Sequence, residues 1–196
     1  HYQQAFKLRP DYLEPLRRGR LIYQSLGDMD MVARLIDLHL SNLVAGEAEQ
    51  GIALALELGQ LKLRLHDPGG AVEVLRSALR MHNEASEEAE VPEQLLATLA
   101  ESYMSPDYQP GISEKEHARR NASDIFLALA KRYLDEELLD ILEKLRAAEE
   151  EEGNTTPLSV EQLVKSKNRP LTDQDKKALG YLKRALSSDI RNVTAA

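Results

Sequence analysis

The sequence predicts an all-α fold, and three observations carry this prediction. Leu and Ala occupy 33 and 22 of the 196 positions, and both residues favour helices. Seven Tyr, two Phe and no Trp leave few aromatic side chains for a β core. Turn signals separate segments of helical length, and no segment carries the signals typical of strands.

The first half of the chain is divided into helices by clear turn and cap residues. Gly27-Asp28 separates two helices, and Asp67 followed by Pro68 is typical of an N-cap and a first helical position. The interval from Pro106 to Pro110 ends a later helix. We therefore expect helices over residues 1–8, 13–26, 29–43, 47–65, 69–82 and 92–104.

In the second half, helix starts are indicated by capping boxes. Ser113-x-x-Glu116, Ser159-x-x-Gln162 and Thr172-x-x-Asp175 all fit this pattern. Four consecutive Glu at 149–152, followed by residues 153–157, predict a helix end and a linker. The expected helices are 114–134, 136–152, 159–166 and 173–188.

Related patterns recur along these helices. Ala5 and His39 occupy equivalent positions 34 residues apart, and Leu58-Gly59 falls in phase with them. The pattern Ala-x-x-x-Leu-x-x-Ala begins at residue 71 and again at residue 178. These residues resemble the tetratricopeptide repeat (TPR), a helix–turn–helix of 34 residues. The resemblance is strongest over residues 1–82 and weaker over 93–150.

The resemblance implies an α-solenoid of antiparallel helix pairs, a TPR-like superhelix. Small residues such as Gly59, Ala71 and Ala78 would let helix backbones approach, and large residues one turn away would fill the adjoining groove. The chain opens within a segment of helical character and without an initiator Met. We therefore expect a fragment of a larger bacterial TPR-like protein.

The net charge of −8 is unevenly distributed and suggests three segments. Residues 1–83 carry no net charge and hold the TPR-like repeats, the first of them truncated. Residues 84–152 carry −12 and are predicted to form degenerate, acidic TPR-like hairpins. Residues 153–196 carry +4 and are predicted to form a linker and basic C-terminal helices. The acidic middle is interpreted as a solvated face; alternatively, the basic tail folds back on it or docks an acidic partner.

No residue pattern indicates catalysis, a cofactor or a metal. The chain lacks Cys, which excludes thiol catalysis and thiolate ligands. Glu114-x-x-His117 is half of a di-metal motif whose second half is missing, so we interpret it as a solvent-facing pair. His39 lies on an apolar stripe and is expected in the core or at an interface. Gly69-Gly70 has no preceding strand and no following Lys, so it is a turn rather than a phosphate loop.

Other partner classes are disfavoured as well. The basic clusters at 17–20 and 119–120 lack interleaved aromatic residues for base stacking, which argues against nucleic acid. No apolar run of 18 residues is present, so no membrane insertion is predicted. A chain without Cys fits oxidising and reducing compartments alike. The compartment therefore stays open, with the cytoplasm favoured.

The remaining expectation is a surface that binds another protein. In a TPR-like array the first helix of each repeat lines a concave groove that takes a peptide or a partner helix. The residues that the repeat phase places in this groove are Glu14, Arg17, Gln24, Gln60, Leu63, Arg64 and Glu101. Members of the family that grip a C-terminal carboxylate use a Lys, Asn and Arg clamp. The corresponding positions here include Leu21, Leu56 and Ala97, so the clamp is incomplete.

The predicted function is therefore a non-catalytic scaffold for protein–protein interaction. Two alternatives stay open. The chain is a regulatory or docking domain of a larger enzyme, or it is a self-assembly module whose terminal repeats stack end to end.

Overall fold

The fold is taken from a computed structural model that describes residues 13–43, 47–86, 89–134, 139 and 171–188. The regular structure in these residues is helical, and no strand occurs among them. The chain forms two compact units, His1–Gln109 and Pro110–Ala196. The predicted acidic segment 84–152 therefore contributes helices to both units.

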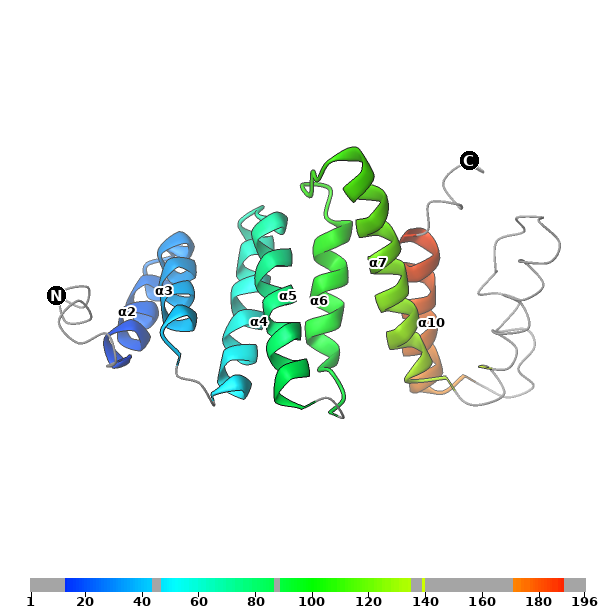
Figure 1. Cartoon of the computed structure of the whole chain (residues 1–196), viewed down its shortest axis with the longest axis horizontal. Helices are drawn as coiled ribbons and strands as arrows, with labels where there is room; N and C mark the ends of the chain where they lie inside the picture. Colours follow the sequence, from blue (N-terminus) through cyan, green and yellow to red (C-terminus); the bar gives the residue numbers. More distant parts are fainter. Residues whose placement is uncertain (1–12, 44–46, 87–88, 135–138, 140–170, 189–196) are drawn as a thin grey trace. The chain divides into compact units, whose positions relative to one another are not determined.

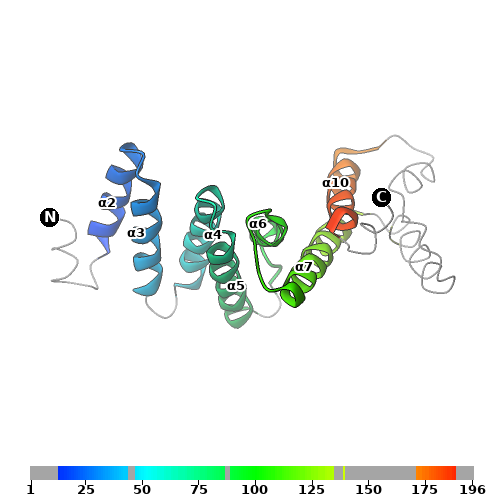
Figure 2. The ribbon, with the colours of Figure 1, turned by 90° about the horizontal axis from the view of Figure 1, so that it is seen from above.

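Unit 1 contains α2 (Glu14–Ser25), α3 (Met29–Ser41), α4 (Ala48–Arg64), α5 (Pro68–Ala85) and α6 (Glu93–Met104). Each helix packs against the next, and α4 also contacts α6. Within this unit α2, α4 and α6 run in one direction and α3 and α5 in the other (Figure 1). Seen from above, α5 lies against both α4 and α6 (Figure 2).

The helix starts follow from side chains that accept backbone N–H groups. Asp28 accepts the amide of Met31 at 3.1 Å, and Asp67 accepts the amide of Gly70 at 2.9 Å. Both contacts pair a donor that the first helical turn leaves without an intrahelical partner. The predicted N-cap at Asp67 is confirmed, with Pro68 as the first helical residue.

The hydrophobic core of unit 1 joins three helices. Val32 and Ile36 of α3 pack with Leu54, Leu58 and Leu61 of α4 in one buried cluster. At the α4–α5 contact, Gly59 faces Leu75, and a Cβ at Gly59 would lie 2.7 Å from the Leu75 side chain. Leu75 is fully buried, so a small residue on α4 makes room for a large one on α5.

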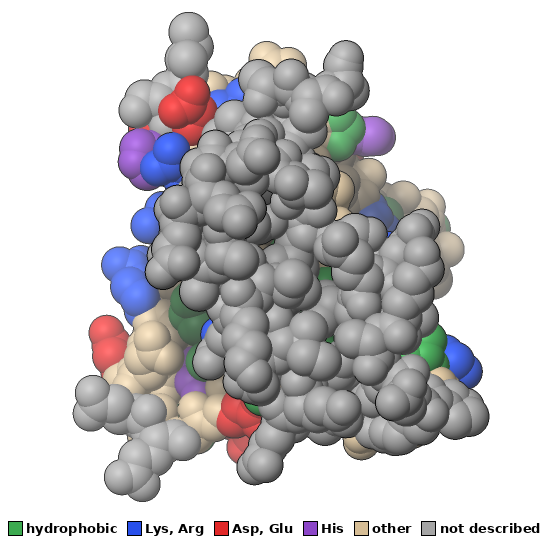
Figure 3. All heavy atoms as spheres, turned by 90° about the vertical axis from the view of Figure 1, so that its right-hand side faces the viewer, with side chains coloured by type: hydrophobic (Ala, Val, Ile, Leu, Met, Phe, Trp, Pro, Cys, Tyr) green, Lys and Arg blue, Asp and Glu red, His purple; other side chains and the backbone are tan. Residues whose placement is uncertain are grey.

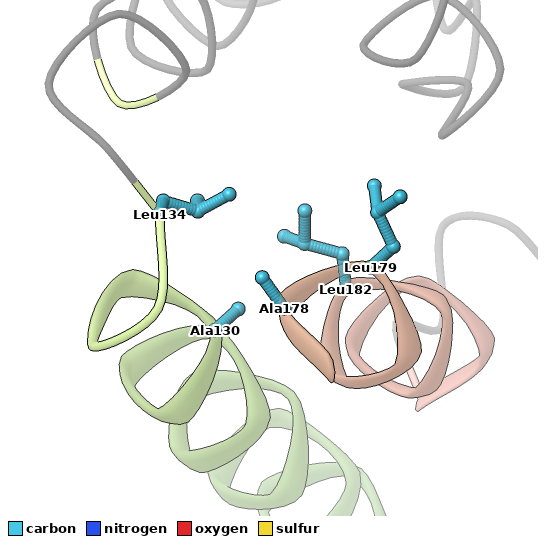
Figure 4. Packing of buried hydrophobic residues seen from close by; sticks show 5 residues of the cluster. All are labelled: Ala130, Leu134, Ala178, Leu179 and Leu182. Atoms are coloured by element: carbon cyan, nitrogen blue, oxygen red, sulfur yellow. The ribbon is translucent and has the colours of Figure 1, made fainter. Parts of the chain in front are cut away.

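Unit 2 contains α7 (Ile112–Lys131) and α10 (Asp173–Ser188), which pack closely against each other. Ala130 of α7 and Ala178 of α10 point toward one another, with Leu182 beside them (Figure 4). Two small residues at the crossing let the backbones approach, and Leu134 and Leu179 complete the buried cluster.

Two cations of α10 lie over aromatic rings in and just after α7. Lys177 donates a hydrogen bond to the Tyr133 hydroxyl at 3.0 Å, and its ammonium lies 4.4 Å from the centre of that ring. The Arg184 guanidinium lies 5.5 Å from the centre of the Phe126 ring. The basic helix α10 thus packs on a helix of the acidic segment through apolar and cation–π contacts.

The all-α prediction is confirmed for the described residues. The expected helices 13–26, 29–43, 47–65, 69–82, 92–104, 114–134 and 173–188 match α2 to α7 and α10 closely. The expected helices 1–8 and 159–166 and almost all of 136–152 lie outside the described residues, as does the Ser159 capping box.

The two remaining capping boxes have different outcomes. At α10, Asp175 accepts the amide of Thr172 at 2.7 Å, and the Thr172 hydroxyl accepts the amide of Asp175 at 3.2 Å, so this box is confirmed. The box assigned to Ser113 is wrong. Helix α7 already begins at Ile112, and Glu114 accepts the amide of Gly111 at 3.3 Å.

Candidate functional site

We give the name α2–α4 seam to a set of exposed polar and apolar side chains on helices α2 and α4. An ion pair joins the two helices, because the Arg20 guanidinium donates to the Glu57 carboxylate at 3.0 Å. The residues beside this pair that face away from the core are Arg17, Leu21 and Gln24 of α2 and Gln60 and Arg64 of α4, all of them exposed.

Helical spacing explains why these five residues share one surface. Leu21 and Gln24 lie four and seven positions after Arg17, which places all three on one stripe of α2. On α4, Gln60 and Arg64 lie three and seven positions after Glu57. The opposite stripes of both helices enter the core through residues such as Leu16 and Leu58. The seam therefore consists of solvent-facing residues of two amphipathic helices.

Leu21 is the most unusual member of the seam because 63% of its surface is exposed. Its helical position lies almost opposite the buried stripe that contains Leu16 and Gly19. Nothing in the packing of unit 1 requires an apolar residue there. A large exposed apolar side chain beside charged groups is typical of a contact surface.

Burial and the charged residues of α2 both affect the pKa of His39, a buried residue of α3. His39 of α3 is 4% exposed, and its Nε2 lies 3.4 Å from the side-chain nitrogen of Gln50. Burial lowers the pKa of His39 below its ordinary value, and the charges of Arg17 and Arg20 lower it further against the opposing effect of Glu47. His39 is therefore a buried core residue, in agreement with the sequence analysis.

The structure brings some of the predicted groove residues together and separates others. Arg17, Gln24, Gln60 and Arg64 lie on the seam. Leu63 lies half-buried on α4, and Glu101 is exposed on α6. Glu14 is half-buried, and its carboxylate accepts a hydrogen bond from Arg18 at 2.8 Å.

Sequence reasoning did not identify the Arg20–Glu57 pair, which fixes the register of the seam. The two residues are 37 positions apart, and no local pattern links them. In the sequence analysis, Leu21 was considered only as a mismatch to the carboxylate clamp. Its exposure could have been predicted, because an apolar residue there lies among Arg18, Arg20 and Gln24 on the polar side of an amphipathic helix.

The other histidines form no chemical site in the described residues. No cluster of three or more His, Cys, Asp or Glu suited to a metal ion occurs among them. His117 and Glu114 are both exposed. His66 caps the end of α4 with a left-handed φ of 59° and contacts Asp107 at 2.8 Å. His82 is buried with its Nδ1 unpaired, inside the helix packing of unit 1.

The described surface in Figure 3 carries both positive and negative side chains. In the space-filling view, Lys and Arg side chains and Asp and Glu side chains both lie on the described surface (Figure 3). No described helix is long and apolar enough to cross a membrane.

Comparisons with known proteins do not assign this chain to a family. No protein-family model matches it, and a search of curated proteins finds no match. The surface itself therefore provides the evidence on function.

Proposed function

We propose that this chain is a non-catalytic scaffold that binds another protein through the concave side of a TPR-like α-solenoid, with the α2–α4 seam at its centre. The single observation that carries the proposal is the exposure of Leu21 beside Arg17 on α2, a helix that the Arg20–Glu57 ion pair joins to α4. Exposed apolar and guanidinium groups side by side are typical of interface centres.

The order of helix contacts supports the solenoid part of the proposal. In unit 1 the helices alternate in direction, and α4 contacts both α5 and α6. This is the arrangement expected when the first helices of successive pairs lie side by side. Gly59 against Leu75 supplies the small-against-large packing that such an array needs between paired helices.

The side chains of the seam support binding rather than catalysis. Arg, Leu and Gln offer donors, acceptors and apolar surface, but no nucleophile and no general base with a pKa near neutrality. An enzyme built on this surface would need such a group from another part of the molecule. A binding surface needs only hydrogen-bond donors, acceptors and apolar area, which these side chains supply.

Site-specific photocrosslinking tests the proposal in the protein's native cells. A photoreactive phenylalanine in place of Leu21 or Gln60 should capture the same partner. The same residue in place of Arg76, which is exposed on α5, should not. Equal capture from all three positions, or none from the seam, would contradict the proposal.

Self-association is a second candidate, favoured by apolar residues away from the seam. Leu26 is 71% exposed, Ile22 43% and Leu38 of α3 38%. Exposed apolar side chains can pack against a second copy. Light scattering at two protein concentrations tests this. A mass that rises with concentration and falls back in Leu26→Glu supports self-association, and a constant monomer mass eliminates it.

A further inference from the structure

We propose that the exposed side of α10 is a docking surface of its own and that its partner is an acidic amphipathic helix of another protein. This surface, which we name the α10 face, consists of four cations around one glycine: Lys176, Lys177, Gly180, Lys183 and Arg184. On the partner helix, two acids seven residues apart bind the cations, and a large apolar side chain between them lies over the glycine.

Helical spacing gathers the four cations around Gly180. They lie four and three residues before it and three and four residues after it, so all five residues share one side of α10. All five are exposed, whereas the opposite side of the helix packs on α7 through Ala178 and Leu182 (Figure 4). Within the described helix α10, Asp173 is the one acid on the exposed side. The α10 face therefore carries an excess of positive charge.

Packing within the chain does not explain the glycine in the middle of the α10 face. Glycine destabilises a helix interior relative to alanine, and other glycines in helices lie at contacts. A Cβ at Gly59 would lie 2.7 Å from the Leu75 side chain, and a Cβ at Gly51 would lie 3.4 Å from that of Leu43. A Cβ at Gly180 meets nothing within 4 Å. The space over Gly180 can therefore take a large side chain from outside, as the space at Gly59 takes Leu75.

Two of the cations are already positioned by aromatic rings. The Lys177 ammonium lies 4.4 Å from the centre of the Tyr133 ring, and the Arg184 guanidinium lies 5.5 Å from that of Phe126. Side chains that are held in place lose less conformational freedom when a partner binds. These contacts therefore prepare one cation on each side of Gly180 for binding.

The other two cations keep most of their charge for an external acid. Lys176 pairs with Asp173 at 2.8 Å, but 63% and 98% of the two side chains are exposed, and an ion pair between exposed groups contributes little. Among the described residues, none forms a hydrogen bond or an ion pair with Lys183. Carboxylates are strong ligands for both ammonium groups.

The chemistry of the α10 face favours a helix over an extended segment. Lys and Arg donate hydrogen bonds and accept none, and the backbone groups of α10 are paired within the helix. An extended segment has amide N–H groups that need acceptors, which the cations cannot supply. A helix pairs its own backbone and presents only side chains.

Nucleic acid fits the α10 face less well than an acidic helix. Binding of single strands uses aromatic side chains on which bases stack. The aromatic residue of α10, Tyr181, is half-buried, and its ring stacks on those of Phe126 and Tyr133 within unit 2. The exposed positions around Gly180 are cations, which attract a polyanion but do not stack its bases.

The positions of the cations set the sequence pattern of the partner. Seven residues of helical rise separate Lys176 from Lys183 by about 10 Å. Two acids seven residues apart match this distance on a helix that crosses α10 at a small angle. A residue three positions after the first acid lies on the same side of that helix, over Gly180. The predicted pattern is acid-x-x-apolar-x-x-x-acid.

The inference does not depend on the function proposed above. The α10 face shares no residue with the α2–α4 seam and lies in unit 2. Helix α10 has the pattern Ala-x-x-x-Leu-x-x-Ala in common with α5, the second helix of its pair, and in the proposed solenoid the second helices do not line the groove.

Nuclear magnetic resonance of the labelled full-length chain tests the inference with three capped, Ala-rich helical peptides of about twenty residues. The acidic peptide carries two Glu seven residues apart and a Leu three residues after the first. The neutral peptide has Gln in place of both Glu, and the shifted peptide carries its Glu five residues apart, on different sides of the helix. We expect the acidic peptide to shift amides of residues 176–184 and to bind at least about fivefold more tightly than either control.

Matched charge variants separate the α10 face from general electrostatics. K176E/K183E should weaken binding of the acidic peptide at least about tenfold, because two attractive pairs become repulsive. K115E/K131E changes the net charge equally on exposed lysines of α7. This control should retain binding within about twofold.

A second pair of variants tests the open space over Gly180. Gly180→Leu should leave the helix folded, because nothing lies within 4 Å of the new Cβ, and circular dichroism checks this. It should weaken binding of the acidic peptide at least about fivefold, because the new side chain occupies the place of the peptide's Leu. Ala128→Leu, at an exposed position of α7, should have no such effect.

Each other outcome overturns the inference and leaves the proposal for the seam in place. Equal binding of the acidic and neutral peptides, or equal loss in both double variants, shows that the face does not recognise paired acids. Full binding to Gly180→Leu shows that no side chain lies over the glycine. Stronger shifts of the same amides with a single-stranded oligonucleotide or with anionic lipid vesicles identify another class of ligand. Shifts of these amides with protein concentration alone identify a second copy as the occupant, and the absence of any shift eliminates the site.

Discussion

At the scale of single residues, two glycines in helices show opposite physical roles. A Cβ on Gly59 would lie 2.7 Å from the buried Leu75, whereas a Cβ on Gly180 of α10 meets nothing within 4 Å. Gly59→Ala should therefore cost about 1–3 kcal/mol through overpacking. Gly180→Ala should gain about 0.5–1 kcal/mol because it removes backbone freedom from the unfolded chain. Urea unfolding measures both, and a stabilising G59A would show that the α4–α5 contact is looser than described.

The lowered pKa of His39 predicts how the stability of the folded chain depends on pH. Burial, Arg17 and Arg20 hold its pKa below the ordinary 6.5 in the folded state. The unfolded chain then binds more protons, so the free energy of unfolding should fall as the pH drops below about 6.5. His39→Gln should flatten this dependence.

The variant Arg17→Glu should raise the pKa of His39, because it replaces a repelling cation with an attracting anion. A titration of the His39 ring by nuclear magnetic resonance measures the shift. An unchanged pKa in R17E would show that Arg17 does not contribute to it.

At the scale of elements, Asp67 links the end of α4 to the start of α5. Its carboxylate accepts hydrogen bonds from Lys62 at 2.7 Å and from the amide of Gly70 at 2.9 Å. These contacts, with Lys62 first, hold the pKa of Asp67 below the ordinary 3.8. Because the folded pKa is the lower one, the stabilisation is present above about pH 4 and is lost as the pH falls.

Replacement of this cap should destabilise the α4–α5 pair. Asp67→Ala should cost about 1 kcal/mol at pH 7 and less at a pH low enough to protonate the wild-type carboxylate, whose pKa lies below the ordinary 3.8. Thermal unfolding at both pH values measures the difference. A cost that does not change with pH would mean that the charge of Asp67 contributes nothing and that only its shape matters.

The helices themselves could be predicted because their signals are local. Asp28, Asp67 and Thr172 start helices at the predicted places, and each acts within three residues of itself. The start of α7 was misplaced because Glu114 pairs with the amide of Gly111. Gly has no side chain to signal a cap, and the Ser113 pattern was a plausible competitor.

Contacts between distant segments could not be predicted in the same way. Arg20 and Glu57 are 37 residues apart, and Tyr133 and Lys177 are 44 apart. Any exposed Arg on one helix could pair with several acids on the next, and only the packed register selects one of them. The residues of the seam were therefore mostly predictable from helical phase, whereas the ion pair that aligns them was not.

At the scale of the whole molecule, the division at Gln109 and Pro110 predicts two units that respond separately to core changes. Ala178 is fully buried against α7 in unit 2, as Gly59 is against α5 in unit 1. Ala178→Leu should overpack that crossing at a cost of about 1–3 kcal/mol. Because distant cores without shared partners behave additively, the change should accelerate amide exchange in α7 and α10 only.

Hydrogen exchange measured segment by segment distinguishes separate units from one cooperative domain. In A178L the amides of α4 and α5 should exchange at the wild-type rate, and in G59A the pattern should be reversed. The double variant A178L/G59A should show both local effects with no added loss. Faster exchange in α4 and α5 of A178L would mean that the two units unfold together. In that case a partner bound at the seam would also stabilise α7 and α10, by the linkage between binding and folding.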